Sequence, residues 1–183
     1  MYELDVAVTR AINGLAGHSA AIDYLMVWVS GIGVPVMVMA VALQWWRGSD
    51  RTHIRHVLVA AGFSFLLGLG LNQLILLFIH RARPYDNGVT DLLIERSADF
   101  SFPSDHATAT FAIAAAFLLH GARRAGFAFL AAACLVTFSR IYIGTHYAGD
   151  VFGGALTGVI AALIVLAIYR EGTKADLLIT RIF

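Results

Sequence analysis

Four apolar runs in this chain are long enough to cross the hydrocarbon core of a membrane. They cover residues 21–46, 54–79, 125–144 and 151–169, and each is close to or above the roughly 20 residues that a spanning helix needs. Hydrophobic residues make up 59% of the sequence, charged residues only 14%, and the mean hydropathy is +0.76. This composition excludes an ordinary soluble domain, and we predict an all-α integral membrane protein.

A fifth apolar run, residues 107–120, is shorter. Extending it back to Ser104 gives 17 residues, which is about the lower limit for a span. Residues 2–15 have apolar side chains at helical spacing and predict an amphipathic helix that packs on the outer membrane surface. We therefore expect one domain over residues 1–183, a bundle of five transmembrane helices plus an N-terminal amphipathic helix.

The distribution of basic residues predicts the orientation. With five spans, one face collects Arg47, Arg51, Arg55, Arg123, Arg124, Arg170, Lys174 and Arg181, and the positive-inside rule makes that face cytoplasmic. The opposite face holds Arg10, Arg81, Arg83, Arg96 and Arg140 with most of the acidic residues. The expectation is a multi-pass protein of the inner (plasma) membrane with a cytoplasmic C-terminus. No cleavable signal peptide is visible, so the first span is expected to direct insertion.

Charged side chains interrupt the apolar sequence between Ser139 and Asp150. Charges at membrane depth are costly enough to mark functional candidates. His146 and Asp150 are four positions apart, so on a helix they share one face and the carboxylate can accept a hydrogen bond from one imidazole nitrogen. The other nitrogen is then left basic, and a chain bend at Gly144 can bring the Arg140 guanidinium beside the imidazole.

A nucleophile or base held in a fixed orientation beside the N–H donors of a guanidinium is suited to attack on an oxyanion. Phosphate is the leading candidate for that oxyanion. The alternative is a purely structural lock of Arg140, His146 and Asp150 between helices.

Two further polar segments fall at the same outer level. The turn His80-Arg81-Ala82-Arg83-Pro84-Tyr85 carries two arginines that are either interfacial anchors or anion ligands. Phe102-Pro103-Ser104-Asp105-His106 opens the short run, with Ser104 placed as an N-cap at a helix start whose amides can bind an anion. His106 can deliver a proton to a departing oxygen; the alternative is a capping serine with an incidental histidine. Convergence of all three segments on one face favours a catalytic site.

Two loop regions carry structural expectations. Residues 86–100 form the longest outer connection, where Leu92, Leu93, Arg96 and Phe100 suggest a short surface helix. His53 and His56 fall in the basic inner loop and are expected to be solvated surface residues.

These motifs resemble the type 2 phosphatidic acid phosphatase (PAP2) superfamily. Its signature is a Lys seven residues ahead of an Arg-Pro, a Pro-Ser-X-His, and a Ser-Arg-X5-His-X3-Asp; the chain has Arg83-Pro84, Pro103-Ser104-Asp105-His106 and the whole third motif. The resemblance implies that His146 attacks phosphorus to give a phosphohistidine, that Asp150 orients it, and that His106 protonates the leaving group. It also implies that Arg83, Ser104 and Arg140 hold the phosphoryl oxygens, without a required metal or other cofactor, because arginines and helix amides supply the neutralising charge.

The chain departs from the family pattern at two positions. The family lysine falls at Leu76, so Arg81 or His80 is expected to supply the missing charge, unless the site holds its substrate differently; Arg81 is counted here among the phosphate-binding candidates. Asp105 stands where glycine is commonest. Its carboxylate must point away from the phosphate, be protonated, or contact something else, such as a second phosphate through a divalent cation.

The wording Ser-Phe-Pro-Ser-Asp-His-Ala-Thr looks most like the undecaprenyl-diphosphate phosphatase branch. The expected function is therefore hydrolysis of the terminal phosphate of a polyprenyl diphosphate, which recycles the lipid carrier of the cell envelope. Other lipid phosphates are the nearest alternatives: phosphatidylglycerophosphate, phosphatidate and lipid A phosphate. A transporter with an intramembrane ion path is the distant one. The expected partner is the lipid substrate, with no nucleic acid and no obligate protein partner.

Overall fold

The computed structural model describes residues 2–46 and 50–181, and within them every regular element is helical. The elements are α1 (Tyr2–Asn13), α2 (Ala20–Ala42) with its 3-10 extension η1 (Leu43–Trp46), α3 (Arg51–Leu76), α4 (Asp105–Leu119), α5 (Arg123–Tyr142), α6 (Ala148–Ile168) and α7 (Lys174–Thr180). The expected all-α class is confirmed. Arg47, one of the residues that set the predicted orientation, lies outside the described part of the chain.

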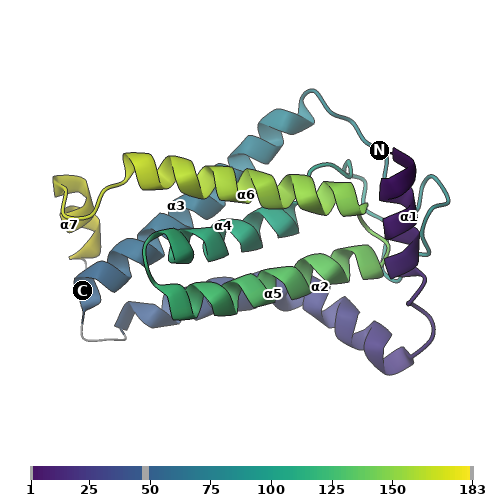
Figure 1. Ribbon diagram of the computed structural model, residues 1–183, viewed down its shortest axis with the longest axis horizontal. Coiled ribbons are helices and arrows are strands. Elements are labelled where there is room, and N and C mark those ends of the chain that lie inside the picture. The colour runs from purple at the N-terminus through teal and green to yellow at the C-terminus, as the bar shows by residue number, and fades with distance from the viewer. Residues whose placement is uncertain (1, 47–49, 182–183) are drawn as a thin grey trace.

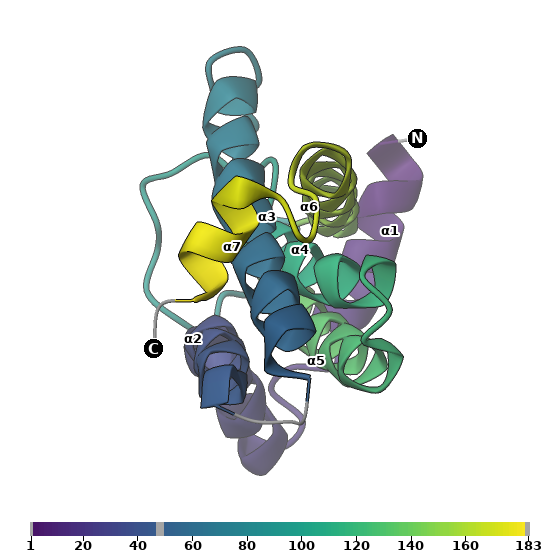
Figure 2. The same cartoon turned by 90° about the vertical axis from the view of Figure 1, so that its left-hand side faces the viewer.

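Four of the helical segments are long and apolar enough to cross a membrane: Ala20–Trp46, Arg51–Leu76, Arg123–Tyr142 and Ala148–Ile168. The fifth apolar helix, α4, has 15 residues and lies at the centre of the bundle, with α3, α5 and α6 around it (Figure 2). Nine of its residues are buried. Protein rather than lipid therefore surrounds most of α4.

Glycines allow the helices around α4 to approach it closely. A Cβ atom at Gly154 would collide with the Ser104 carbonyl, and one at Gly158 with the Thr108 carbonyl. A Cβ at Gly68 of α3 would lie 2.8 Å from Thr108 Cγ2 and 3.6 Å from Ala161 Cβ, so α3 approaches both α4 and α6 at this point. The sequence pattern of small residues four apart in α6 thus marks a true helix contact.

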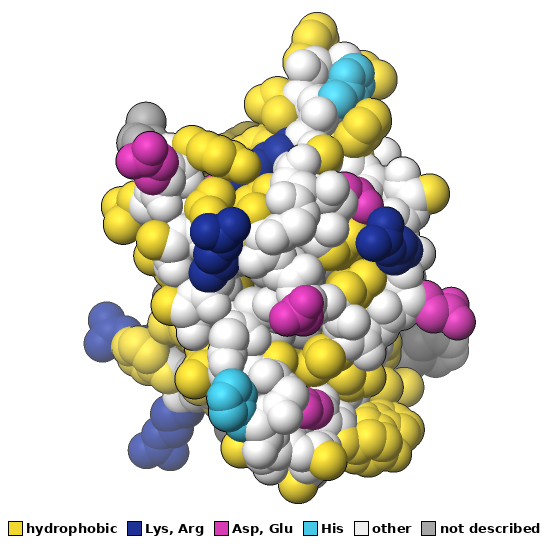
Figure 3. All heavy atoms as spheres, turned by 90° about the vertical axis from the view of Figure 1, so that its right-hand side faces the viewer, with side chains coloured by type: hydrophobic (Ala, Val, Ile, Leu, Met, Phe, Trp, Pro, Cys, Tyr) yellow, Lys and Arg dark blue, Asp and Glu magenta, His cyan; other side chains and the backbone are white. Residues whose placement is uncertain are grey.

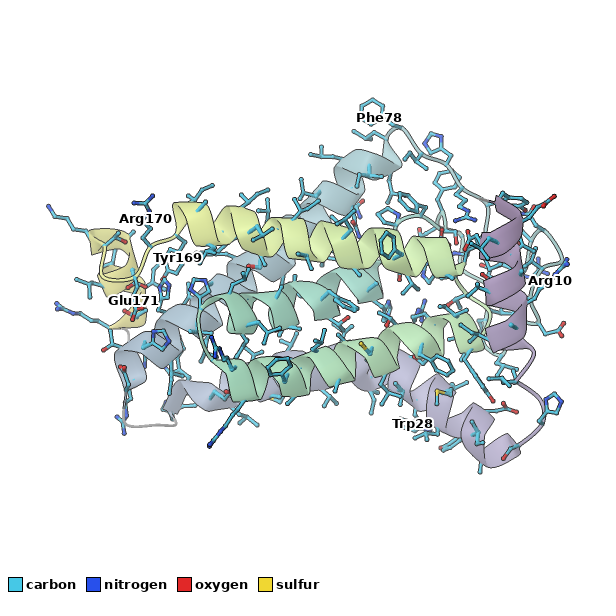
Figure 4. The ribbon with its side chains drawn as sticks, viewed as in Figure 1. Arg10, Trp28, Phe78, Tyr169, Arg170 and Glu171 are labelled. Atoms are coloured by element: carbon cyan, nitrogen blue, oxygen red, sulfur yellow. The ribbon has the colours of Figure 1, made fainter. Side chains whose placement is uncertain are left out.

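α1 lies across one end of the bundle, roughly at right angles to the long helices (Figure 1). Its Leu4 and Val8 side chains are 69% and 40% exposed. Large apolar side chains of the long helices are also exposed, among them Trp28 of α2 and Phe78 after α3, which point away from the bundle (Figure 4). This exposed apolar surface suits a lipid environment.

The connection between α3 and α4 contains no helix, so the expected surface helix within residues 86–100 is wrong. Its backbone groups are satisfied by a turn after Pro84 and by distant partners instead. Leu93 N donates to Ile143 O at 3.1 Å, Ser101 N donates to Arg81 O at 2.8 Å, and Tyr85 Oη donates to Ser97 O at 3.0 Å. Tertiary hydrogen bonds have outweighed the local pattern in this segment.

The opposite end of the bundle is closed by α7, which docks on α3 and the end of α6. His56 is 1% exposed and Asp176 is fully buried, so the expectation of a solvated His56 is wrong. Asp176 Oδ1 lies 2.8 Å from His56 Nδ1 and accepts from Tyr169 Oη at 2.6 Å, while Gly172 N donates to Asp176 Oδ2 at 2.8 Å. Tyr169, Arg170 and Glu171 lead from α6 to α7 here (Figure 4).

We predict that Asp176→Asn lowers the stability of the fold by about 3 kcal/mol, since the buried carboxylate has hydrogen bonds with Tyr169, His56 and Gly172 N that an amide cannot replace in full. Burial alone raises the pKa of Asp176, but the hydrogen bonds from Tyr169, His56 and Gly172 N outweigh it and lower the pKa of the carboxyl. A carboxyl group whose pKa is lowered in the folded protein stabilises the folded state at pH values above its unfolded pKa of 3.8. This stabilisation is lost as the pH falls through the lower pKa of the folded state.

Thermal unfolding in detergent at pH 7 and at pH 3 measures the prediction. The difference between wild type and Asp176→Asn should be largest at pH 7 and shrink in acid. The matched control is Glu171→Gln, which removes a solvent-exposed pair with His53 and should cost less than about 1 kcal/mol. An equal loss in both variants at pH 7 would contradict the assignment.

Candidate active site

A cavity of about 440 Å³ opens at the end of the bundle near α1. Figure 3 faces this end and shows basic, acidic and histidine side chains set among hydrophobic ones. Residues predicted for catalysis or phosphate binding contribute to the lining from four separate segments: Arg83, His106, Arg140 and His146. The expected convergence of the three motifs at one end of the bundle is therefore observed.

His146 is placed by a tight loop, residues 143–147, that joins α5 to α6. Gly144 has a φ of +84°, a left-handed conformation that glycine adopts without strain. Any Cβ there would also collide with Asp91 O. Thr145 N then donates back to Arg140 O at 3.1 Å. The bend expected at Gly144 is thus present, and Arg140 and His146 line the same cavity.

The imidazole of His146 is held mainly by the backbone. His146 Nδ1 lies 2.9 Å from the Ser101 carbonyl oxygen but 3.7 Å from Asp150 Oδ2, which exceeds hydrogen-bond distance. The direct bond expected between His146 and Asp150 is replaced by one to Ser101 because His146 precedes α6, which begins at Ala148. Nδ1 donates to this carbonyl, so the lone pair is on Nε2, 3.5 Å from Arg83 Nη1.

Asp150 is fully buried and is linked to His146 through shared hydrogen-bond partners. Asp150 Oδ2 accepts from Ser101 Oγ at 2.5 Å and from Tyr147 N at 2.9 Å, while Arg81 Nη1 lies 2.6 Å from Asp150 Oδ1. Ser101 therefore joins the two residues, with its hydroxyl on Asp150 and its carbonyl on His146. Sequence reasoning missed Ser101, which lies in a loop without periodicity.

Electrostatics keeps His146 neutral. Burial, together with the positive charges of Arg140 and Arg83, outweighs the attraction of Asp150 and lowers the pKa of the His146 imidazole. A neutral imidazole with a free lone pair is the nucleophilic form.

Two predicted phosphate ligands have unused hydrogen-bonding atoms. Among the described residues, the buried side-chain nitrogen and oxygen atoms without a partner are Arg140 Nε, Ser104 Oγ and Asn72 Oδ1. Ser104 occupies the N-cap position of α4, but its hydroxyl makes no capping bond. Arg140 is oriented by Ser30 of α2, whose Oγ accepts from Arg140 Nη1 at 2.6 Å. Ser30 is a second residue that sequence reasoning missed.

Arg83 is fixed by backbone carbonyls. It donates from Nε to Asp99 O at 2.9 Å and from Nη1 to Thr145 O at 3.0 Å. Nε and Nη1 of Arg83 thus bind backbone carbonyls rather than carboxylates. Arg83 lines the cavity with its positive charge not neutralised at these atoms.

Arg81 is not placed as expected. It does not line the cavity; its guanidinium instead pairs with Asp5 and Asp150, at 2.6 Å each, and lies 3.8 Å from the Tyr147 ring centroid. The Arg81 guanidinium thus contacts carboxylates in this structure, and its assignment to phosphate stays a prediction. The His80 ring lies 4.6 Å from the Phe100 ring, centroid to centroid, with the two planes tilted by 35°. His80 is also absent from the cavity lining, so neither residue supplies a substitute charge beside Leu76.

Asp105 lines the cavity next to His106, and its Oδ1 accepts from Asn72 Nδ2 at 2.7 Å. Asn72 also donates to Thr108 Oγ1 at 2.9 Å, so its side chain hydrogen-bonds α3 to α4. Among the residues that the structure describes, no group of three or more His, Cys, Asp or Glu side chains has the geometry to hold a metal ion.

Residues 57–174 match the sequence profile of the PAP2 superfamily. The chain belongs to the PAP2 superfamily. It is 32% identical over 161 residues to undecaprenyl-diphosphatase BcrC of Bacillus subtilis, covering 88% of this chain and 82% of the relative. It is 30% identical over 169 residues to the putative undecaprenyl-diphosphatase YbjG of Escherichia coli, covering 91% and 83%. This PAP2 protein is accordingly a membrane phosphatase.

Solved structures share its fold. A PAP2-type phosphatidylglycerolphosphate phosphatase from Bacillus subtilis superposes with a TM-score of 0.69 at 21% identity, covering 94% of this chain and 88% of that one. Aquifex aeolicus LpxE superposes with a TM-score of 0.63 at 24% identity, covering 90% and 95%. At these identities the likeness establishes the helical PAP2 architecture.

Proposed function

We propose that this PAP2 phosphatase removes the terminal phosphate from a polyprenyl diphosphate, most specifically undecaprenyl diphosphate, and so recycles the lipid carrier of the cell envelope. The relatives that bear the name undecaprenyl-diphosphatase cover more than four fifths of the chain. The sequence around His106 supports the same branch.

Buried side-chain atoms without a hydrogen-bond partner are the main support for a phosphate-binding site. A buried polar atom without a hydrogen bond costs about 1–3 kcal/mol. Arg140 Nε and Ser104 Oγ are two of the three such side-chain atoms in the described residues, and both belong to the motifs expected to hold phosphoryl oxygens. An oxyanion bound in the cavity beside Arg83 would satisfy Arg140 Nε, since both arginines line the cavity. Ser104 is fully buried directly behind the lining residues Pro103 and Asp105, and its hydroxyl would bind the same oxyanion from there.

The proposed reaction has two steps. His146 Nε2 attacks the terminal phosphorus, a P–N bond forms, and the bridging P–O bond breaks; protonated His106 gives its proton to the lipid monophosphate that leaves. Water then attacks the phosphohistidine with His106 as general base, the P–N bond breaks, and inorganic phosphate departs. Arg83, Arg140 and Ser104 stabilise the charge on the non-bridging oxygens in both steps.

The substrate assignment is supported by the mixed lining of the cavity. Apolar side chains of Leu76, Ile94 and Phe100 lie on the same cavity as the arginines, which suits a lipid with a charged end. Phosphatidylglycerophosphate, phosphatidate and lipid A phosphate share this description and are the alternative substrates.

We further propose five spans, with α4 as the fifth, in the inner (plasma) membrane. The cavity then faces the outer side, because Arg51, Arg55, Arg123, Arg124, Arg170, Lys174 and Arg181 all belong to the opposite end of the bundle. The C-terminus is cytoplasmic in this arrangement. A reporter fused after Phe183 measures the topology, and an external signal would contradict it.

Phosphate release by the purified protein in detergent tests the function. The panel contains polyprenyl diphosphate, phosphatidylglycerophosphate, phosphatidate and lipid A phosphate, each with and without chelator, and His146→Ala as control. We expect fastest release from the diphosphate, loss of release in the variant with the fold intact, and activity that persists in chelator because arginines neutralise the charge. A loss only for the diphosphate in chelator would show that a divalent cation assists through the second phosphate. Fastest release from a monophosphate would refute the carrier assignment.

The role of His106 makes a separate prediction. His106→Ala should slow formation of the phosphoenzyme by about 100-fold or more, and most strongly for substrates with poorly leaving alcohols. Rapid-quench measurement with a series of phosphate esters of differing leaving-group pKa tests this. Equal slowing across the series would remove the general-acid assignment.

A further inference from the structure

α1 carries a row of polar residues that faces the protein. Asp5, Thr9 and Asn13 are spaced four apart, so they lie along one side of the helix. Thr9 is fully buried and Asn13 is 6% exposed, whereas Leu4 and Val8 on another face are exposed. A surface helix on a soluble core has the reverse arrangement, so the buried polar row requires an explanation.

The three residues of the row hydrogen-bond to the chain on both sides of the loop that carries His146. Asn13 Nδ2 donates to Tyr142 O at 2.8 Å, at the last residue of α5. Thr9 Oγ1 accepts from Ala148 N at 3.0 Å, and Asp5 Oδ1 accepts from Gly149 N at 2.7 Å. The two acceptors satisfy amides in the first turn of α6, which have no partner within the helix. α1 therefore fixes the chain immediately before and immediately after residues 143–147.

Asp5 also reaches the nucleophile by a second route. Its Oδ2 lies 2.6 Å from Arg81 Nη2, and Arg81 Nη1 lies 2.6 Å from Asp150 Oδ1. Arg81 O accepts from Ser101 N at 2.8 Å, and Ser101 O in turn accepts from His146 Nδ1. Arg81 thus connects α1 to Asp150 through its guanidinium and to Ser101 through its backbone carbonyl.

We propose that the Asp5–Thr9–Asn13 row of α1 positions the nucleophile, with Asp5 acting through Arg81. These are positioning residues, since none of them lines the cavity. The inference rests on the proposed role of His146 as nucleophile and assigns α1 to catalysis as well as to packing. A misplacement of about 1 Å can cost a factor of about 100 in rate, so small losses of order in this loop should be measurable.

Steady-state kinetics on the wild type's best lipid substrate tests the proposal. Asp5→Asn and Thr9→Val should each lower kcat by about 10- to 100-fold with KM changed less than about twofold, because neither residue contacts substrate. Thr9→Ser retains the acceptor hydroxyl and should recover most of kcat. Glu3→Gln is the matched carboxylate control on the exposed side of α1 and should leave both constants unchanged.

A double-mutant cycle tests the route through Arg81. If Asp5 acts on the nucleophile mainly by holding Arg81, Asp5→Asn should have a much smaller effect in an Arg81→Gln background than in the wild type. Additive effects would refute this route. An increase in KM alone for Arg81→Gln would instead return Arg81 to phosphate binding.

Thermal unfolding and size-exclusion chromatography of each variant separate positioning from folding. Full kcat in well-folded Asp5→Asn and Thr9→Val proteins would overturn the proposal, as would failure of Thr9→Ser to restore kcat. These outcomes differ from failure of the proposed function, in which the wild type itself releases no phosphate from any lipid of the panel.

Discussion

The site depends on the compensation of one buried charge. The Asp150 carboxylate has no exposed surface, and an uncompensated charge in such a position would cost several kcal/mol. Arg81 supplies the opposite charge, while the Ser101 hydroxyl and the Tyr147 amide supply hydrogen bonds. Because these partners come from separate segments, satisfying Asp150 draws the two outer loops and the start of α6 together. The orientation of His146 follows from that assembly.

Close packing of α6 against α4 brings the site residues of the two helices together. Gly154 and Gly158 leave space only for backbone where α6 meets α4, and Ser104 N donates to Asp150 O at 3.1 Å across the same contact. The start of α4, which carries Ser104 and His106, is thus registered directly against the helix that carries Asp150. Small residues at this contact act on the chemistry through geometry, as their side chains contribute no functional groups.

The sequence predicted the helical class, the long apolar segments and the meeting of the three motifs, because each has a strong local signal: length, hydropathy, or a charged residue in an apolar context. Ser30 and Ser101 could not be found in this way, since a single serine gives no periodic pattern and the partner on Ser101 that holds His146 is a carbonyl oxygen common to every residue. The position of Arg81 was also beyond sequence reasoning. Its charge is as suitable for a phosphate as for a carboxylate, and only the placement of Asp5 and Asp150 on either side of it distinguishes the two.

α1 has two unlike surfaces on a single short helix. Leu4 and Val8 are exposed, while Asp5 and Thr9, the next residues along the chain, hold the first turn of α6. An α-helix with its side chains is only about 10 Å across. At this point only one helix separates the surroundings of the protein from the loop that bears His146. The same two turns of α1 form the outer and the inner surface of that barrier.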